Sequence, residues 1–169
     1  MMTFSKNKSI VYIIPSLDIG GTEKHLFNLA TSISNHYKVE IICLDNRGLL
    51  SSHLPARIKL INLANNESKL FFFKYFLLAY QLWKILKPKK CIVHFFLPKS
   101  YLVAGTICIL QRKTKLIMSR RSTNYYQKKY PFIKFWENIL HKKMKYILVN
   151  SYNLRNQLLS DEGVDKSKI

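Results

Sequence analysis

The sequence predicts an α/β fold, a Rossmann-like doubly wound domain with a mostly parallel sheet of about six or seven strands. Two observations lead to this prediction. Short runs rich in β-branched residues alternate along the chain with longer segments of helical periodicity. The strand-like runs are also apolar almost throughout, which is typical of strands that are buried on both faces of a parallel sheet.

The first strand-helix pair is the most clearly patterned part of the chain. The run SIVYII (Ser9–Ile14) predicts a strand, a glycine-bearing turn follows, and a helix extends from about Thr22 to Asn35. The apolar stripe of this helix consists of Leu26, Phe27, Leu29, Ala30 and Ile33.

The next strands are Tyr37–Leu44 and Arg57–Leu63, separated by the loop Asp45–Pro55 with its asparagine, glycine and proline turn residues. A helix over Ser68–Lys87 ends because the next residue is Pro88.

The second half of the chain repeats the alternation. Strands are expected at Lys90–Phe96, Lys115–Ser119 and Lys145–Asn150, and helices at Ser100–Gln111, Phe132–Lys143 and Ser151–Asp161. The residues after Gly163 lead toward a further strand, and the sequence stops there in mid-pattern. We expect one domain over residues 1–169.

The charge balance is strongly positive, with 28 Lys and Arg against 9 Asp and Glu. Such an excess favours a polyanionic partner, such as nucleic acid, anionic lipid or a phosphorylated substrate. It can equally reflect a lysine-rich composition without a function. Both interpretations stay open.

Three cysteines, Cys43, Cys91 and Cys108, lie in apolar surroundings without metal-ligand spacing, so we expect reduced, buried thiols. The apolar run after the basic N-terminus is too short for a signal peptide. The segment Leu70–Leu86 contains lysines and falls short of the ~20 apolar residues of a spanning helix. These features predict a cytoplasmic protein.

Candidate functional residues follow the strands, because ligands of open parallel sheets bind beyond the carboxyl ends of the strands. The segments and residues concerned are Pro15–Glu23, His94, Lys99, Arg120, Arg121, Asn150 and Ser151. The glycine pair Gly20 and Gly21 before a helix lets backbone amides approach a phosphate, although it can also be a simple connecting turn. The fingerprint G-x-G-x-x-G is absent, which argues against a dinucleotide site.

Four segments in order resemble family-4 glycosyltransferases. They are SIVYIIPSLDIGGTEKHLFNLA, IVHFFLP, KLIMSRRS and YILVNSYNLR, and together they extend over nearly the whole chain. The resemblance implies the N-terminal half of a two-domain GT-B fold, in a retaining, hexosyltransferase-type enzyme that uses a nucleotide-sugar donor. The implied acceptor is a cell-envelope polysaccharide or glycolipid.

By this resemblance Gly20 and Gly21 would lie against the donor diphosphate, and His94, Arg120, Arg121 and Ser151 would line the acceptor or sugar pocket. Many relatives carry a histidine where this chain has the arginine pair. An arginine can bind a phosphate or an acidic sugar with two hydrogen bonds, whereas the alternative is a solvated basic loop. His94 can likewise be a pocket donor or a structural histidine.

The resemblance places the residues that bind the nucleotide sugar in a second domain, which is absent from this sequence. No carboxylate pair, metal cluster or Ser-His-Asp arrangement is present, so we assign no catalytic residue and expect no metal and no cofactor. Transition-state stabilisation would be electrostatic. We expect the chain alone to be inactive.

The segment between Glu67 and Glu137 contains no Asp or Glu, while lysines and aromatic residues recur. This pattern favours peripheral binding to an anionic membrane, with Lys128, Lys129, Lys134 and Trp136 at the surface. For most rings between Phe71 and Tyr80 we expect core packing instead.

Two alternatives remain for the function. The chain can be a non-catalytic basic module that binds nucleic acid or an anionic membrane, although it shows no recognised nucleic-acid motif. It can also be the product of a split or degraded gene. Nucleic acid is the less favoured partner.

Overall fold

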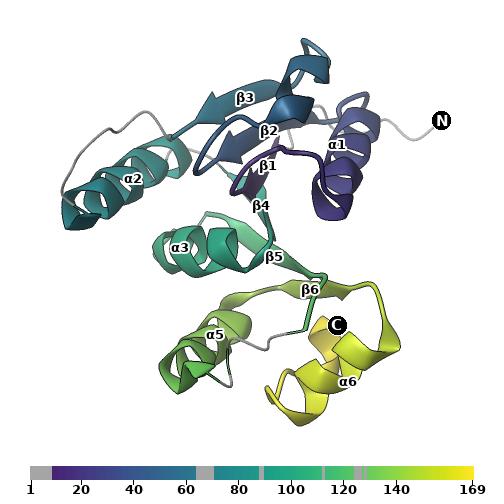
Figure 1. Ribbon diagram of the computed structural model, residues 1–169, viewed down its shortest axis with the longest axis vertical. Helices are drawn as coiled ribbons and strands as arrows, with labels where there is room; N and C mark the ends of the chain where they lie inside the picture. The colour runs from purple at the N-terminus through teal and green to yellow at the C-terminus, as the bar shows by residue number, and fades with distance from the viewer. Residues whose placement is uncertain (1–8, 64–70, 88–89, 112, 124–126, 128) are drawn as a thin grey trace.

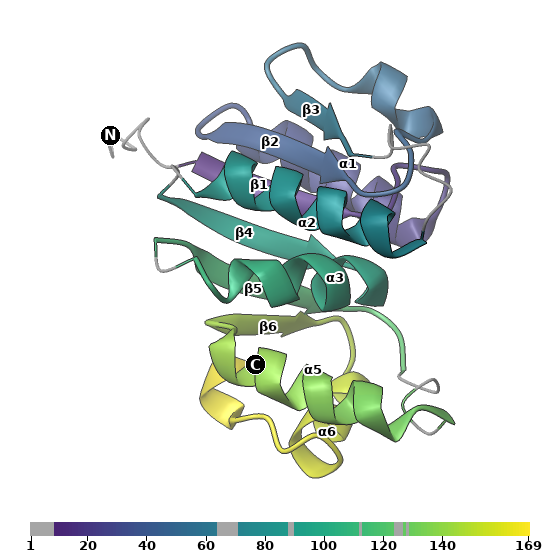
Figure 2. The same ribbon diagram turned by 90° about the vertical axis from the view of Figure 1, so that its left-hand side faces the viewer.

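The computed structural model describes residues 9–63, 71–87, 90–111, 113–123, 127 and 129–169. Figures 1 and 2 show the fold as a single sheet with helices on both faces. The strands are β1 (Ser9–Ile14), β2 (Lys38–Cys43), β3 (Lys59–Asn62), β4 (Cys91–Phe96), β5 (Lys115–Arg120) and β6 (Tyr146–Val149). The helices are α1 (Gly21–Ile33), α2 (Phe71–Leu86), α3 (Pro98–Cys108), α5 (Pro131–Lys143) and α6 (Tyr152–Ser160). Two short 3₁₀ helices, η1 (Leu49–His53) and η2 (Lys166–Lys168), lie among the described residues as well.

The six strands have the order β3-β2-β1-β4-β5-β6, and every pairing between neighbours is parallel. This confirms the predicted Rossmann-like fold class. The chain builds the sheet outward from β1 to β3 and then returns to place β4 on the other side of β1. The order therefore reverses between β1 and β4, which is where ligands bind in open sheets of this kind.

The helices cover the two faces unequally. Helices α2, α3 and α5 lie side by side on one face, as Figure 2 shows, while α1 lies on the other. Helix α6 packs beside β6, near that edge of the sheet (Figure 1). On the α1 side the strand β6 is left partly open, because Tyr146 and Leu148 are 46% and 49% exposed.

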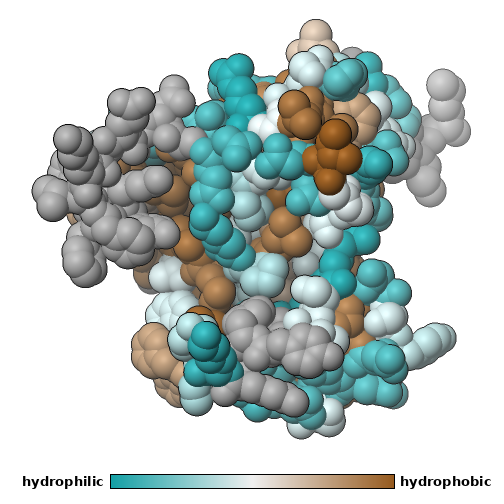
Figure 3. All heavy atoms as spheres, viewed as in Figure 1, coloured by the Kyte–Doolittle hydropathy of each residue, from teal (hydrophilic) through white to brown (hydrophobic). Residues whose placement is uncertain are grey.

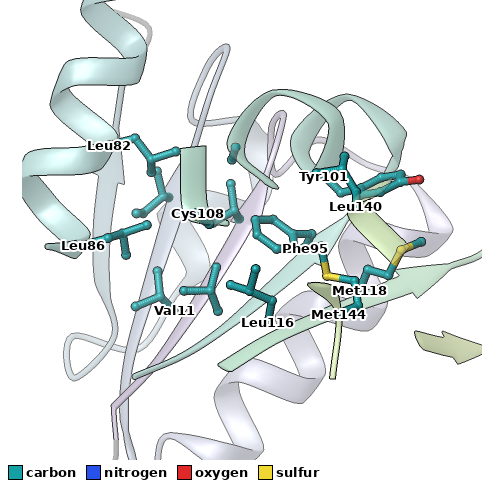
Figure 4. Close-up of a cluster of buried hydrophobic side chains, with 14 of the residues drawn as sticks. Val11, Leu82, Leu86, Phe95, Tyr101, Cys108, Leu116, Met118, Leu140 and Met144 are labelled. Carbon is teal, nitrogen blue, oxygen red and sulfur yellow. The ribbon is translucent and has the colours of Figure 1, made fainter. Parts of the chain in front are cut away.

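Side chains along each strand point alternately to the two faces of the sheet, and the core is therefore divided into two clusters. In the larger one, Val11 and Phe95 from the strands pack against Leu82 and Leu86 of α2 and Cys108 of α3, all buried (Figure 4). The smaller cluster lies between α1 and the opposite face of β1, β2 and β4. Successive strand residues thus enter different cores, which is why the strand sequences are apolar throughout.

Local sequence signals explain several helix boundaries. Helix α3 begins at Pro98 and not at Ser100, since proline suits the first turn, where its missing amide hydrogen is not needed. Leu97 before it has φ of 69°, a left-handed conformation that costs a leucine about 1–3 kcal/mol. Helix α6 begins where the Ser151 side chain accepts a hydrogen bond from the Leu154 amide at 3.3 Å.

Candidate functional site

The loop between β1 and α1 is anchored firmly to the neighbouring β2 loop. Leu17 is fully buried, its amide donates to Arg47 O at 3.3 Å, and its carbonyl accepts from Leu50 N at 2.9 Å. Gly48 passes so close to the Leu17 backbone that a β-carbon there would collide with it, and its φ of 71° suits glycine. The loop is therefore held in place before any ligand arrives.

The predicted glycine pair lies at the beginning of α1. Gly20 is extended, and no side chain in the described part of the chain caps the helix at this end. A β-carbon on Gly21 would meet no described atom within 4 Å, whereas one on Gly20 would come 2.9 Å from Glu23 Cδ. The first-turn amides of α1 thus adjoin open space at Gly21, an arrangement that suits an anion.

Carboxylates surround this loop. The Ser16 hydroxyl donates to Asp18 at 2.6 Å, and the Lys99 ammonium binds both oxygens of Asp45 at 2.7 Å. The lysine that follows β4 is therefore paired with an acid of the β2 loop. The glycine loop offers backbone amides but little net positive charge.

A second feature is a hollow of about 260 Å³ between α1 and the ends of β4, β5 and β6, which we call the β4–β6 hollow. It brings together the predicted residues His94, Arg120 and Arg121. The described residues that line it are His25, Leu29, His94, Ser119, Arg120, Arg121, Leu148, Val149 and Asn150. Ser151 lines a neighbouring hollow of about 270 Å³ with Tyr152 and Arg155, and its hydroxyl serves as the cap of α6.

His94 lies within β4, two residues before its end, and only 6% of it is exposed. Its Nε2 hydrogen-bonds the Ser119 hydroxyl at 2.9 Å, and its ring centroid is 4.4 Å from that of Phe96. Burial, together with the positive charges of Arg121 and His25, lowers the His94 pKa to about 3. His94 is therefore neutral near pH 7 and can exchange hydrogen bonds but not supply positive charge.

The two predicted arginines point in different directions. Arg120 borders the hollow, but its guanidinium is buried with Glu162, where Nη2 donates to the two carboxylate oxygens at 3.0 and 2.8 Å. Glu137 lies 3.8 Å from the other terminal nitrogen. Arg121, the first residue after β5, lines the hollow together with His25 and Leu29 of α1 and so lies on the α1 side.

Arg121 is only partly exposed, and within the described residues its guanidinium makes no hydrogen bond or ion pair. Burial lowers its pKa. Burial is the largest cause that lowers the pKa values of His94 and His25, and the positive charge of Arg121 lowers both further. Arg121 thus supplies the positive charge that the hollow's histidines experience.

A buried polar cluster lies under the other face of β5, around Arg120. The His141 Nε2 and the Tyr101 hydroxyl are hydrogen-bonded at 3.1 Å, Glu162 lies 3.6 Å from His141 Nδ1, and Gln127 donates to Glu137. This cluster joins β5, α3, α5 and the segment after α6. Most of its polar groups bind one another, although among the described residues His141 Nδ1 accepts or donates no hydrogen bond, and His141 and Glu162 also border a hollow of about 340 Å³.

His25, like Ser119, is a site residue that the sequence analysis missed. It lies one helical turn after Gly21 on α1, and i to i+4 spacing places both on the same side of that helix. This spacing could have identified it. Among the described residues we find no group of three or more His, Cys, Asp or Glu side chains that could hold a metal.

The predicted membrane-surface residues differ in exposure. Lys128 lies outside the described residues. Lys129 is exposed, with its ammonium 5.5 Å from the Tyr130 ring. Lys134 is half-buried, and Trp136 is turned to α3, where its indole donates to Thr106 at 2.8 Å.

Several aromatic rings are exposed. Phe132 and Phe135 of α5 are 76% and 62% exposed, in line with the surface expected for this segment. Phe76 and Tyr80 of α2 are 67% and 53% exposed and are exceptions to the core packing expected for most rings between Phe71 and Tyr80, where the side chains of residues 71–75 lie outside the description. In Figure 3, apolar groups emerge at several separate places between hydrophilic ones. In the described part of the chain no helix is both long and apolar enough to cross a bilayer.

Comparisons with known proteins support the resemblance seen in the sequence. The family model of Glycosyltransferase Family 4 matches residues 19–169, which include Gly20, Gly21 and all strands after β1. No curated protein matches the chain.

Proposed function

Because the chain belongs to glycosyltransferase family 4, we propose that it is the acceptor-side domain of a retaining, hexosyltransferase-type enzyme with a nucleotide-sugar donor. The observation that carries the proposal is that the β4–β6 hollow reaches α1 at His25, one helical turn from the uncapped end of this helix. Both lie at the carboxyl ends of the strands, around the reversal of strand order, where such sheets bind their ligands.

The donor diphosphate would approach Gly20 and Gly21. Backbone amides and the α1 dipole favour phosphate oxygens there, and the open space at Gly21 permits a close approach. Asp18 and Glu23 add negative charge, so the diphosphate needs cations from elsewhere. By family resemblance these belong to a second domain, and residues 1–169 alone should show no sugar transfer.

The acceptor would enter the β4–β6 hollow. Neutral His94 and Ser119 offer hydrogen bonds that suit sugar hydroxyls, and Asn150 borders the same space. The proposed acceptor is a cell-envelope polysaccharide or glycolipid. No metal enters the proposal, because preorganised amides and cations would stabilise the departing diphosphate.

Gly21→Val tests the donor side of this proposal. In the enzyme that contains both domains, the β-branched side chain would fill the space that the diphosphate requires, so transfer from UDP-, GDP- and ADP-sugars to envelope lipid extracts should fall at least about a hundredfold. The free energy of unfolding should change by no more than about 1 kcal/mol, because the β-carbon meets open space.

Asn28→Val is the matched control. It places the same side chain at an exposed position of the same helix, two turns away, and should leave transfer unchanged. Wild-type transfer by Gly21→Val would show that the glycine pair is only a connecting turn.

We also propose peripheral binding to the anionic, cytoplasmic face of the cell membrane through α5. Phe132 and Phe135 are three residues apart on this helix and both are exposed, which gives an apolar strip. Lys129 and Lys134 flank the strip. Each lysine near an anionic bilayer contributes about 1 kcal/mol, and each exposed ring adds its apolar area.

Vesicle co-sedimentation tests this membrane proposal. The chain should bind vesicles containing phosphatidylglycerol and be released by high salt, and the double change Phe132→Ser, Phe135→Ser should weaken binding. Leu49→Ser, at a 67% exposed leucine near the β3 edge, should have no effect. Equal binding to neutral vesicles, or RNA displacing the chain from vesicles, would contradict the proposal.

A further inference from the structure

Among the described residues Arg121 has no hydrogen-bond or ion-pair partner, and this indicates what the hollow binds. We infer that Arg121 binds an anionic group, a phosphate or a carboxylate, on the molecule that occupies the β4–β6 hollow. The inference rests on the proposed function in one respect, because it takes this hollow to be the acceptor pocket.

The charge distribution is the first argument. No carboxylate is among the described residues that line the hollow. The two acids near β5, Glu137 and Glu162, are directed at Arg120 on the opposite side of the strand. Two adjacent arginines are thus separated: Glu137 and Glu162 neutralise Arg120, whereas no carboxylate of the described residues binds Arg121.

A partly buried guanidinium without a protein partner costs free energy, and Arg121 is in this position among the described residues. Its Nε is buried without a hydrogen-bond partner in the described residues, although a guanidinium has five N–H groups to satisfy. Partial burial already disfavours the charged form and lowers the pKa of this arginine. An anion that accepts two hydrogen bonds from the guanidinium would replace the hydrogen bonds to water that burial removes.

The neighbours of Arg121 limit the kind of ligand. His94 is buried and neutral, and the Ser119 hydroxyl is bound to it, so these two present a fixed polar wall without charge. The volume of about 260 Å³ lies near the lower end of typical ligand pockets, at about 300 Å³. The hollow therefore suits one charged group on a sugar or head group rather than a lipid chain.

The two sources of such a group can be told apart with simple probes on the 169-residue chain. Inorganic phosphate represents a phosphorylated acceptor, glucuronate an acidic sugar, and glucose is the uncharged control. Binding is followed by NMR through the backbone amides of Arg121, Ser119 and Asn150. At least one of the anions should shift these signals, and glucose at the same concentration should not.

Arg121→Gln should weaken anion binding roughly tenfold or more, since a charge-assisted pair is replaced by neutral hydrogen bonds. Arg121→Lys, which keeps the charge but not the planar fork, should retain part of the affinity. Arg47→Gln is the matched control, because Arg47 is exposed in the β2 loop, and β1 and β4 separate β2 from β5. It should bind as the wild type does.

Three results would overturn the inference: wild-type anion affinity in Arg121→Gln, equal loss in Arg47→Gln, or shifts confined to residues 20–23. A folded spectrum of Arg121→Gln shows that any loss is local. The outcome is separate from that of the proposed function, because anion binding needs no sugar transfer. Transfer that is insensitive to Arg121→Gln would refute the inference alone, whereas anion binding without transfer in the two-domain enzyme would refute the function alone.

Discussion

Acid should destabilise this fold strongly through two buried histidines, His94 and His141. Burial is the main cause that lowers the pKa of each to about 3. The charges of Arg121 and His25 add to the effect at His94, and those of Arg120 and Lys168 at His141. The Glu162 carboxylate near His141 opposes the shift, but it is already bound by Arg120.

The sign follows from the lowered pKa values. Below about pH 6.5 the unfolded chain binds protons at these histidines and the native protein does not, so stability falls as the pH falls from about 6.5 toward 3. About pH 5 is roughly 1.5 units below the histidine pKa in the unfolded chain. At 1.36 kcal/mol per unit, each histidine lowers the free energy of unfolding there by about 2 kcal/mol. Together the two histidines lower the free energy of unfolding by about 4 kcal/mol, a large share of the 5–15 kcal/mol that is typical of proteins.

Urea unfolding at about pH 7.5 and pH 5 measures this loss. Single variants His94→Gln and His141→Gln should each lose about 2 kcal/mol less than the wild type over that interval, each compared with itself at the higher pH. Leu82→Ala is the control, since it removes fully buried apolar volume without a titrating group and should lose as much as the wild type. An unchanged acid loss in both histidine variants would refute the reasoning.

Three further outcomes are expected. Gly48→Ala should lower the free energy of unfolding by more than about 1 kcal/mol in urea titration, because its φ is positive and the new β-carbon would collide with the Leu17 backbone. Glu162→Leu should cost about 3–5 kcal/mol in the same assay by leaving Arg120 short of its buried partner, and a near-neutral result would contradict the ion pair's role. The Cys108 thiol should resist Ellman's reagent at about pH 8 until the protein is unfolded, since it is fully buried and burial raises its pKa; rapid native labelling would disagree with this burial.

The order and type of the elements were predictable because they depend on local periodicity. The continuous apolar run of β1 and the striped helix after it indicate a buried strand and its covering helix before any contact is known. Boundaries were less certain, as at α3, where Pro98 extends the helix by two residues. The exposed rings Phe76 and Tyr80 show that aromatic content alone does not reveal which side of a helix is buried.

The composition of the site was only partly predictable. The sequence indicated the edge of the sheet where the candidate residues gather, since the carboxyl ends of parallel strands share one edge. It did not indicate that Ser151 caps α6, because the same hydroxyl can face a ligand or a helix amide. His25 was missed because its role depends on how α1 lies over β4 and β5.

By itself, then, the sequence determined the fold class, the parallel sheet and the family, because each is encoded in patterns of a few consecutive residues. Only the tertiary structure decided between Arg120 and Arg121. Arg120, the last residue of β5, and Arg121, the residue after it, look equivalent in sequence, but in the fold they point to opposite faces of the sheet. Glu137 and Glu162 follow Arg120 by 17 and 42 residues, and folding brings them beneath one of these faces only. These acids neutralise Arg120, whereas the positive charge of Arg121 faces the hollow.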